Sequence, residues 1–110
     1  MYMLLKDKVC LILGAASLRS IGYGTAELFA EHGAKVVVAD VKMDAETLNT
    51  VRSAIQSKVG NEVSVHGFSC DISSPSDCDQ LVREVMALHG TLDCLVNSAG
   101  IVKNIPILEL

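Results

Sequence analysis

The 110 residues carry 13 acidic and 9 basic side chains, a formal net charge of −4, and half of them are hydrophobic. This length suits one domain over residues 1–110, without room for a second core. The charge balance does not favour binding of nucleic acid or anionic lipid, and no apolar run approaches the roughly 20 residues that cross a bilayer. Because the first charges follow the first apolar residues, the reverse of a signal peptide, we expect a cytoplasmic protein.

The chain then alternates between apolar runs and helical patterns. Val9–Leu13 is an apolar run that predicts a strand. A helix is expected over residues 22–32, where apolar residues recur on one face and Gly33 supplies the stop. Lys35–Asp40 contains three consecutive valines, which indicates a strand that is buried on both faces.

The alternation continues along the chain. Apolar residues recur at steps of three and four over Asp44–Val59, which predicts a helix ended by Gly60. Val63–Cys70 predicts a third, less apolar strand, and Leu92–Asn97 predicts a fourth.

Between these last two strands lies a clear helix signal. Ser74 suits the cap position, Pro75 the first helical position, and Gly90 the stop. The stripe expected to face the core consists of Cys78, Leu81, Val82 and Val85.

Three strand–helix units with short connections imply parallel strands joined by right-handed crossovers. We therefore expect an α/β fold, a Rossmann-like doubly wound parallel sheet in the strand order 3-2-1-4. The pattern is truncated after the fourth strand, and Ile107–Leu110 resembles the beginning of a further element.

A glycine-rich turn joins the first strand to the first helix. A pyrophosphate could approach the unpaired N–H groups of the helix start because no side chain intervenes at Gly14, Gly22 and Gly24. Ile21, beside Gly22, is expected to contact the cofactor as well. Ser17 and Ser20 could add hydroxyl donors. A tight turn that only packs a helix on a sheet would also use such glycines.

Acidic residues follow the second and third strands. Asp40 lies 18 residues beyond Gly22, close to the spacing of about 20 at which a carboxylate accepts both hydroxyls of an adenosine ribose. Asp71 could accept from an adenine amino group, with Ile72 packed on the ring. Taken alone, each acid could instead be a solvated strand end.

Small residues follow the fourth strand. The run Asn97-Ser98-Ala99-Gly100 would let a cofactor pass close to the backbone, although an ordinary strand-end turn would look similar.

The four cysteines, Cys10, Cys70, Cys78 and Cys94, make no C-x-x-C pair, and the three histidines are scattered. We expect these cysteines to act as small hydrophobic residues, and we expect no metal site.

Together, Gly14–Gly22, Asp71-Ile72 and the run from Leu92 to Gly100 resemble the short-chain dehydrogenase/reductase family over about residues 6–110. The resemblance implies binding of NAD(P)(H), with Gly14–Gly22 around the pyrophosphate and Asp40 on the adenine ribose. Asp71 and Ile72 would surround the adenine, and Asn97, Ala99 and Gly100 would lie beside the ribose and nicotinamide.

Two features depart from the usual pattern of that family. The turn has two inserted residues, with Ser20 where the middle glycine of Gly-x-x-x-Gly-x-Gly would stand, and Ser98 replaces the commoner second Asn of Asn-Asn-Ala-Gly. The segment Ser20–Gly24 also resembles the enoyl-acyl-carrier-protein reductase branch. Neither departure removes the backbone that would face a phosphate.

The choice of cofactor depends on charge. A 2′-phosphate beside Asp40 would meet like charge, which favours NAD. Arg19 and Lys42 lie near that position and leave NADP open.

The family's catalytic Ser and Tyr-x-x-x-Lys are absent. Tyr2 and Lys6 have the right spacing, but they precede the first strand and are expected to take no part in catalysis. The resemblance therefore predicts the cofactor-binding part of an oxidoreductase acting on alcohol or carbonyl groups, inactive as a 110-residue fragment. The parent enzyme would be a homo-oligomer, and the fragment would be prone to self-association through its bare fourth strand.

Two other classes remain open. One is a non-catalytic nucleotide-binding or interaction module, which would bind cofactor without turnover. The other is an S-adenosylmethionine methyltransferase, which also places acids after its second and third strands, although its cofactor has no phosphate for the Gly14–Gly24 turn.

Overall fold

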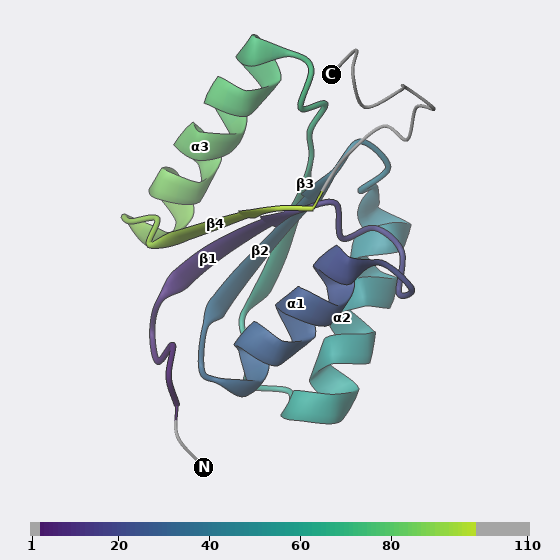
Figure 1. Ribbon diagram of the computed structural model, residues 1–110, viewed down its shortest axis with the longest axis vertical. Coiled ribbons are helices and arrows are strands. Elements are labelled where there is room, and N and C mark those ends of the chain that lie inside the picture. The colour runs from purple at the N-terminus through teal and green to yellow at the C-terminus, as the bar shows by residue number, and fades with distance from the viewer. Residues whose placement is uncertain (1–2, 99–110) are drawn as a thin grey trace, which may run out of the picture.

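The computed structural model describes residues 3–98, which form one parallel sheet and three helices (Figure 1). The sheet order is β3-β2-β1-β4, as expected from the sequence. The strands are β1 (Val9–Leu13), β2 (Lys35–Asp40), β3 (Val65–Ser69) and β4 (Cys94–Asn97). The helices are α1 (Ile21–Glu31), α2 (Ala45–Val59) and α3 (Pro75–His89).

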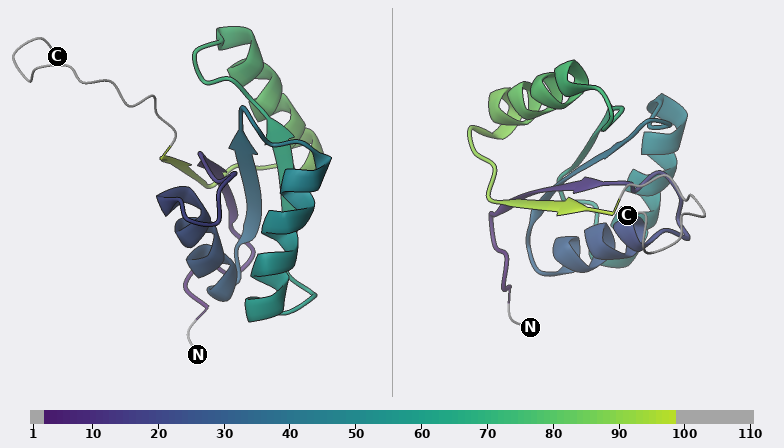
Figure 2. Two further views of the ribbon diagram at one scale, coloured as in Figure 1. Left: turned by 90° about the vertical axis from the view of Figure 1, so that its right-hand side faces the viewer. Right: turned by 45° about the horizontal axis from the view of Figure 1, so that its top comes forward.

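The helices cover both faces of the sheet, as Figure 2 shows, with α1 and α2 on one side and α3 on the other. Alternate residues of each strand face opposite sides. Val36 and Val38 belong to the cluster under α1 and α2, whereas Val37 and Ala39 belong to the cluster under α3. All four are fully buried, which confirms that β2 is covered on both faces. The fold is therefore doubly wound.

The register aligns the carboxyl ends of the strands. Leu13 pairs with Ala39 on one side and with Asn97 on the other, and Asp40 pairs with Ser69. The residues that follow these strands consequently emerge at one edge of the sheet, where open α/β folds bind ligands.

Each helix begins at a capping side chain. Ser20, Asp44 and Ser74 accept a hydrogen bond from a backbone N–H in the first turn of α1, α2 and α3. The helix ends at Gly60 and Gly90 also lie where the sequence predicts them.

Two strands are shorter than expected. The third begins at Val65 rather than Val63, because Val63 donates its N–H to the Gly60 carbonyl in the turn after α2. The fourth begins at Cys94 rather than Leu92.

The buried stripe of α3 is narrower than predicted. Leu81 and Val85 are buried and Cys78 is half-buried, but Val82 is 44% exposed, so its assignment to the core was wrong. At about 100° per residue, Cys78 lies roughly 40° and Val82 roughly 80° from the centre of the face that Leu81 and Val85 define, so Val82 is at the edge of the buried stripe. No helix within residues 3–98 is long and apolar enough to cross a membrane.

Candidate functional site

The turn between β1 and α1 brings the two elements into contact. Gly14 has a φ of 91°, a left-handed conformation that favours glycine, and its N–H donates to the Ala39 carbonyl at 2.8 Å. A Cβ at Gly22 would overlap the Gly14 carbonyl and would lie 2.5 Å from Ser98 Oγ. Only glycine at position 22 lets the start of α1 lie against the end of the strand.

The start of α1 has unused hydrogen-bond donors. Ser20 Oγ accepts from one N–H of the first turn at 3.0 Å. Within the described part of the chain, the N–H groups of Ile21 and Gly22 have no acceptor. The first turn of α1 also lacks an acidic residue, whereas Glu46 and Asp77 occupy the first turns of α2 and α3. This helix start therefore favours an anion from outside the chain.

The hydroxyls of Ser17 and Ser20 hold the turn. Ser20 Oγ donates to the Ser17 carbonyl at 2.7 Å, and Ser17 Oγ accepts from the Arg19 N–H at 3.2 Å. The Ser20 proton is thus used inside the turn, while the Ser17 O–H remains available as a donor. Contact of either hydroxyl with a phosphate stays a prediction.

Asp40 links β2 to the glycine-rich turn. Its Oδ2 accepts from the Ala16 N–H at 3.3 Å, and its Oδ1 accepts from the Lys42 N–H at 3.1 Å. A carboxylate has about four acceptor positions, so two remain for other donors. The half-buried Asp40 side chain therefore both braces the turn and can accept from a ligand.

Asp71 lies on an exposed loop between β3 and α3. Its Oδ1 accepts from the N–H and the Oγ of Ser73, at 2.9 and 2.7 Å, and these bonds hold the pKa of Asp71 below its ordinary value. The carboxylate consequently stays charged. Ile72 beside it is 40% exposed, which suits an apolar contact with a ligand.

Ser98 fastens β4 to β1. Both its N–H and its Oγ donate to the Leu13 carbonyl, at 3.0 and 2.6 Å, and the same Oγ lies against Gly22. Sequence reasoning noted Ser98 only as a departure from a motif, because the contact depends on how β4 and α1 meet in space. Asn97 pairs in register with Leu13, whereas Ala99 and Gly100 lie outside the described residues.

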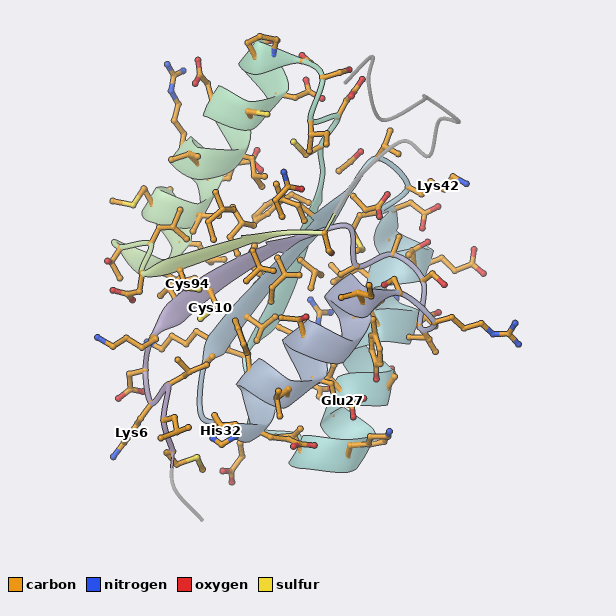
Figure 3. All side chains as sticks on the ribbon, in the orientation of Figure 1. Lys6, Cys10, Glu27, His32, Lys42 and Cys94 are labelled. Atoms are coloured by element: carbon orange, nitrogen blue, oxygen red, sulfur yellow. The ribbon has the colours of Figure 1, made fainter. Side chains whose placement is uncertain are left out.

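The structure thus brings Gly14, Gly22, Asp40 and Ser98 to one edge of the sheet, with Asp71 following the adjacent strand. Lys42 marks this edge in Figure 3, and Lys6 and His32 mark the opposite one.

A hollow of about 570 Å³ lies at the opposite edge, lined by residues that include Gly33, Lys35, Gly60 and Ser64. It contains none of the predicted site residues.

Residues 3–98 hold no group of three or more His, Cys, Asp or Glu that could bind a metal ion. Tyr23 is buried, and burial, reinforced by Glu27, raises the pKa of its phenol to about 12. Tyr2 lies outside the described residues, and Lys6 lies before β1, far from the carboxyl edge.

Comparison with known proteins identifies a family model and relatives that match this chain. A family model described as enoyl-(acyl carrier protein) reductase matches residues 14–110. An uncharacterised short-chain type dehydrogenase/reductase of Sinorhizobium fredii is 38% identical over 109 residues, which are 98% of this chain and 41% of the relative. Tropinone reductase-like 1 of Erythroxylum coca is 41% identical over 99 residues, 90% of this chain and 33% of that protein.

Solved structures of dehydrogenases and reductases have the same fold as this chain. A short-chain dehydrogenase from Mycobacterium smegmatis superposes with a TM-score of 0.81 at 31% identity, covering 99% of this chain and 43% of that one. L-sorbose reductase from Gluconobacter frateurii, crystallised with NADPH and L-sorbose, gives a TM-score of 0.81 at 33% identity, covering all of this chain and 40% of that one. The chain thus spans well under half the length of the proteins it matches.

Proposed function

The chain belongs to the short-chain dehydrogenase/reductase family, and on that premise we propose that its carboxyl edge binds NAD(H) for an oxidoreductase acting on alcohol or carbonyl groups. The start of α1 carries the proposal: its first turn holds no acid, two of its N–H groups have no acceptor within residues 3–98, and the strand end lies so close that a Cβ at Gly22 would overlap backbone. An ordinary packing turn would share the close approach, and every helix start leaves N–H groups unpaired, so the missing acid is what distinguishes α1 from α2 and α3.

The pyrophosphate would lie at the N–H groups of Ile21 and Gly22, because they and the helix dipole favour a negative group. Gly14 keeps the turn free of a side chain, and the Ser17 hydroxyl adds a donor. Ser20 acts indirectly by holding the first turn of α1.

The adenosine would lie beyond Asp40. Two acceptor positions of its carboxylate remain for the two ribose hydroxyls, and Asp71 with Ile72 would flank the adenine. On the other side of the pyrophosphate, the nicotinamide half of the cofactor would lie beside Asn97, Ala99 and Gly100. When bound, the nicotinamide would supply or accept a hydride.

NAD rather than NADP is favoured by the charge of Asp40, which would repel a 2′-phosphate at short range. The NADPH in L-sorbose reductase shows that a similar fold takes the phosphorylated cofactor. Arg19 and Lys42, both exposed near this position, are the residues that would accommodate such a phosphate here.

The activity of the whole protein follows from its relatives by analogy. They include reductase-like proteins and a mitochondrial borneol dehydrogenase of Lavandula x intermedia, enzymes named for work on alcohols and ketones. The family assignment disfavours the methyltransferase alternative. The alternative of a non-catalytic nucleotide-binding module predicts the same cofactor binding but no reaction. A cytoplasmic location and a homo-oligomeric parent stay predictions from the sequence.

The test is a titration of the 110-residue chain with NADH and with NADPH, followed by nicotinamide fluorescence. We expect saturable binding that prefers NADH and is weakened at least tenfold in Asp40→Ala, since that variant loses ribose hydrogen bonds and the brace on Ala16. Glu62→Ala removes an exposed acid at the opposite edge and should bind like the unmodified chain. Equal affinity for both cofactors would contradict the preference, and binding unchanged in Asp40→Ala would contradict the site.

A further inference from the structure

The four cysteines fall into two pairs of neighbours, all of them free thiols. Cys10 and Cys94 are register partners on β1 and β4, and they lie side by side in Figure 3. Cys70 directly follows β3, and Cys78 lies at the start of α3. The seven residues between Cys70 and Cys78 include Asp71 and Ile72, which lie at the carboxyl edge of the sheet.

The second pair forms a compact unit. Cys70 is buried at 2% exposure, and Cys78 packs against the apolar cluster to which Cys70 belongs. The Cys78 thiol donates to the Ile72 carbonyl at 3.7 Å. Burial, together with the charge of the adjacent Cys78 and a hydrogen bond between the two side chains, raises the pKa of Cys70 to about 11.

Backbone geometry separates the two pairs. Opposite side chains on parallel strands point the same way, so the Cβ atoms of Cys10 and Cys94 keep roughly the strand spacing of about 4.8 Å, whereas the Cβ atoms of a disulfide lie about 3.8 Å apart. Cys10 and Cys94 are the first pair of the β1–β4 ladder, and the Asp93 N–H also donates to the Val9 carbonyl at 2.9 Å, so their backbones are held at the strand spacing. Cys70 and Cys78 are joined by an exposed loop, so their backbones can approach without breaking a ladder.

Access also differs within the second pair. Cys78 is half-buried and can meet a small oxidant, whereas Cys70 is buried. This order suits one cysteine that is oxidised first and a second that resolves it.

We propose that Cys70 and Cys78 form a reversible disulfide when the protein meets a peroxide, and that this bond modifies the loop flanking the nucleotide site. Hydrogen peroxide oxidises the Cys78 thiol to a sulfenic acid and releases one water. The Cys70 sulfur then attacks the Cys78 sulfur and the S–S bond forms as the S–O bond breaks. The sulfenic hydroxyl leaves with the Cys70 proton as a second water. Two thiols are oxidised and one peroxide is reduced to two waters. A dithiol reductant reverses the change.

The consequence for binding rests on the proposed function. An S–S bond of about 2 Å draws the Cys78 sulfur to Cys70 and removes the S–H that holds the Ile72 carbonyl. Because Ile72 is assigned to the adenine, we expect the oxidised protein to bind NADH about threefold more weakly, comparable to losing one modest hydrogen bond.

Peptide mapping distinguishes the pairs without any cofactor. Trypsin leaves Cys70 and Cys78 together in residues 59–83, whereas Cys10 and Cys94 fall in separate peptides, residues 9–19 and 84–103. After peroxide and an alkylating agent, we expect peptide 59–83 to be two hydrogens lighter and unalkylated, and to become doubly alkylated after dithiothreitol. Cys78→Ser should abolish this signature, and the matched control Cys94→Ser should retain it.

Three results would overturn the assignment: a cross-link between peptides 9–19 and 84–103, a disulfide-linked dimer, or full alkylation of peptide 59–83 after peroxide. Unchanged NADH affinity in a protein that carries the internal disulfide would overturn its effect on the site. If the reduced chain does not bind NADH, the proposed function fails, while the peptide map still decides whether this disulfide forms.

Discussion

At the scale of single residues, the contact between Gly22, Gly14 and Ser98 sets the geometry of the turn. We expect Gly22→Ala to abolish measurable NADH binding and to lower the free energy of unfolding by about 1–3 kcal/mol, because its methyl group would overlap backbone. Gly24→Ala, two residues along α1, is a matched control: the sequence groups Gly24 with the glycines of the turn, but an added Cβ there meets nothing within 4 Å. It should bind normally and gain about 0.5–1 kcal/mol of stability. Urea unfolding and NADH titration of both variants provide the measurement. Equal NADH affinity and equal free energy of unfolding in the two variants would refute this contact.

Ser20 offers a second residue-scale prediction. Ser20→Ala removes the cap of α1 and should cost about 1 kcal/mol in urea unfolding, and so should Ser74→Ala at the cap of α3. Only Ser20→Ala should also weaken NADH binding, because only α1 begins at the proposed phosphate position. Equal binding by the two variants would show that the start of α1 does not contact the cofactor.

The same scale shows what sequence patterns can and cannot predict. Asp40 is identified from its spacing beyond a glycine, since that spacing reflects one strand–helix–strand unit. Its hydrogen bond to the Ala16 N–H is not predictable in this way, because it depends on the path of the turn after β1. Ser98 was missed for the same reason, since its two bonds to the Leu13 carbonyl cross between strands distant in sequence.

At the scale of elements, the bounds of helices and strands were predicted best where they depend on residues close together in the sequence. The bounds of β1 and β2 agree with the sequence because each is a continuous apolar run with both faces covered. The cap Ser74 was predicted because its signal lies within one turn, whereas Ser20 and Asp44 were not identified as caps from the sequence. β3 was less well predicted, because its start depends on the hydrogen bond between Val63 and Gly60.

The contact between β3 and the end of α3 predicts a response to pH. His66 and His89 stack edge to face, with ring centroids 5.6 Å apart. Burial lowers the pKa of both; Arg52 adds to the effect at His66, and at His89 the neighbouring His66 and Lys35 add to it. As pH falls below about 6.5, the unfolded chain therefore takes up protons before the folded one, and stability decreases.

The corresponding measurement is urea unfolding at several pH values between 7.5 and 5.5. We expect the free energy of unfolding to decline towards acid in the unmodified chain and to decline less in His89→Phe, which keeps an aromatic ring without a titrating group. Identical slopes would exclude this pair as a source of the pH dependence. The exposed Asp44 and Asp71, whose pKa values are lowered, lose their stabilising bonds only at lower pH.

At the scale of the whole molecule, the described residues leave one side of the sheet partly uncovered. β4 is an edge strand within residues 3–98, and its Leu95 is 58% exposed on the face that α3 covers. Its register partner Leu11 is only 2% exposed on that same face, so α3 shields β1 but not β4.

An exposed apolar edge favours pairing with another chain. We expect the 110-residue chain to self-associate as its concentration rises, and Leu95→Lys to reduce this association. Sedimentation velocity at increasing concentrations measures both. Val41→Lys, which changes an exposed apolar residue outside β4, should associate like the unmodified chain. The same sedimentation profile for Leu95→Lys and the unmodified chain would exclude this edge as the interface.

Amide chemical shifts of the ¹⁵N-labelled chain during an NADH titration locate the bound cofactor on the chain. We predict the largest changes at Ala16, Ile21 and Gly22, whose N–H groups line the carboxyl edge, with little change at Gly60 and Ser64 beside the hollow at the opposite edge. Changes concentrated at Gly60 and Ser64, with Ile21 and Gly22 unaffected, would contradict the account.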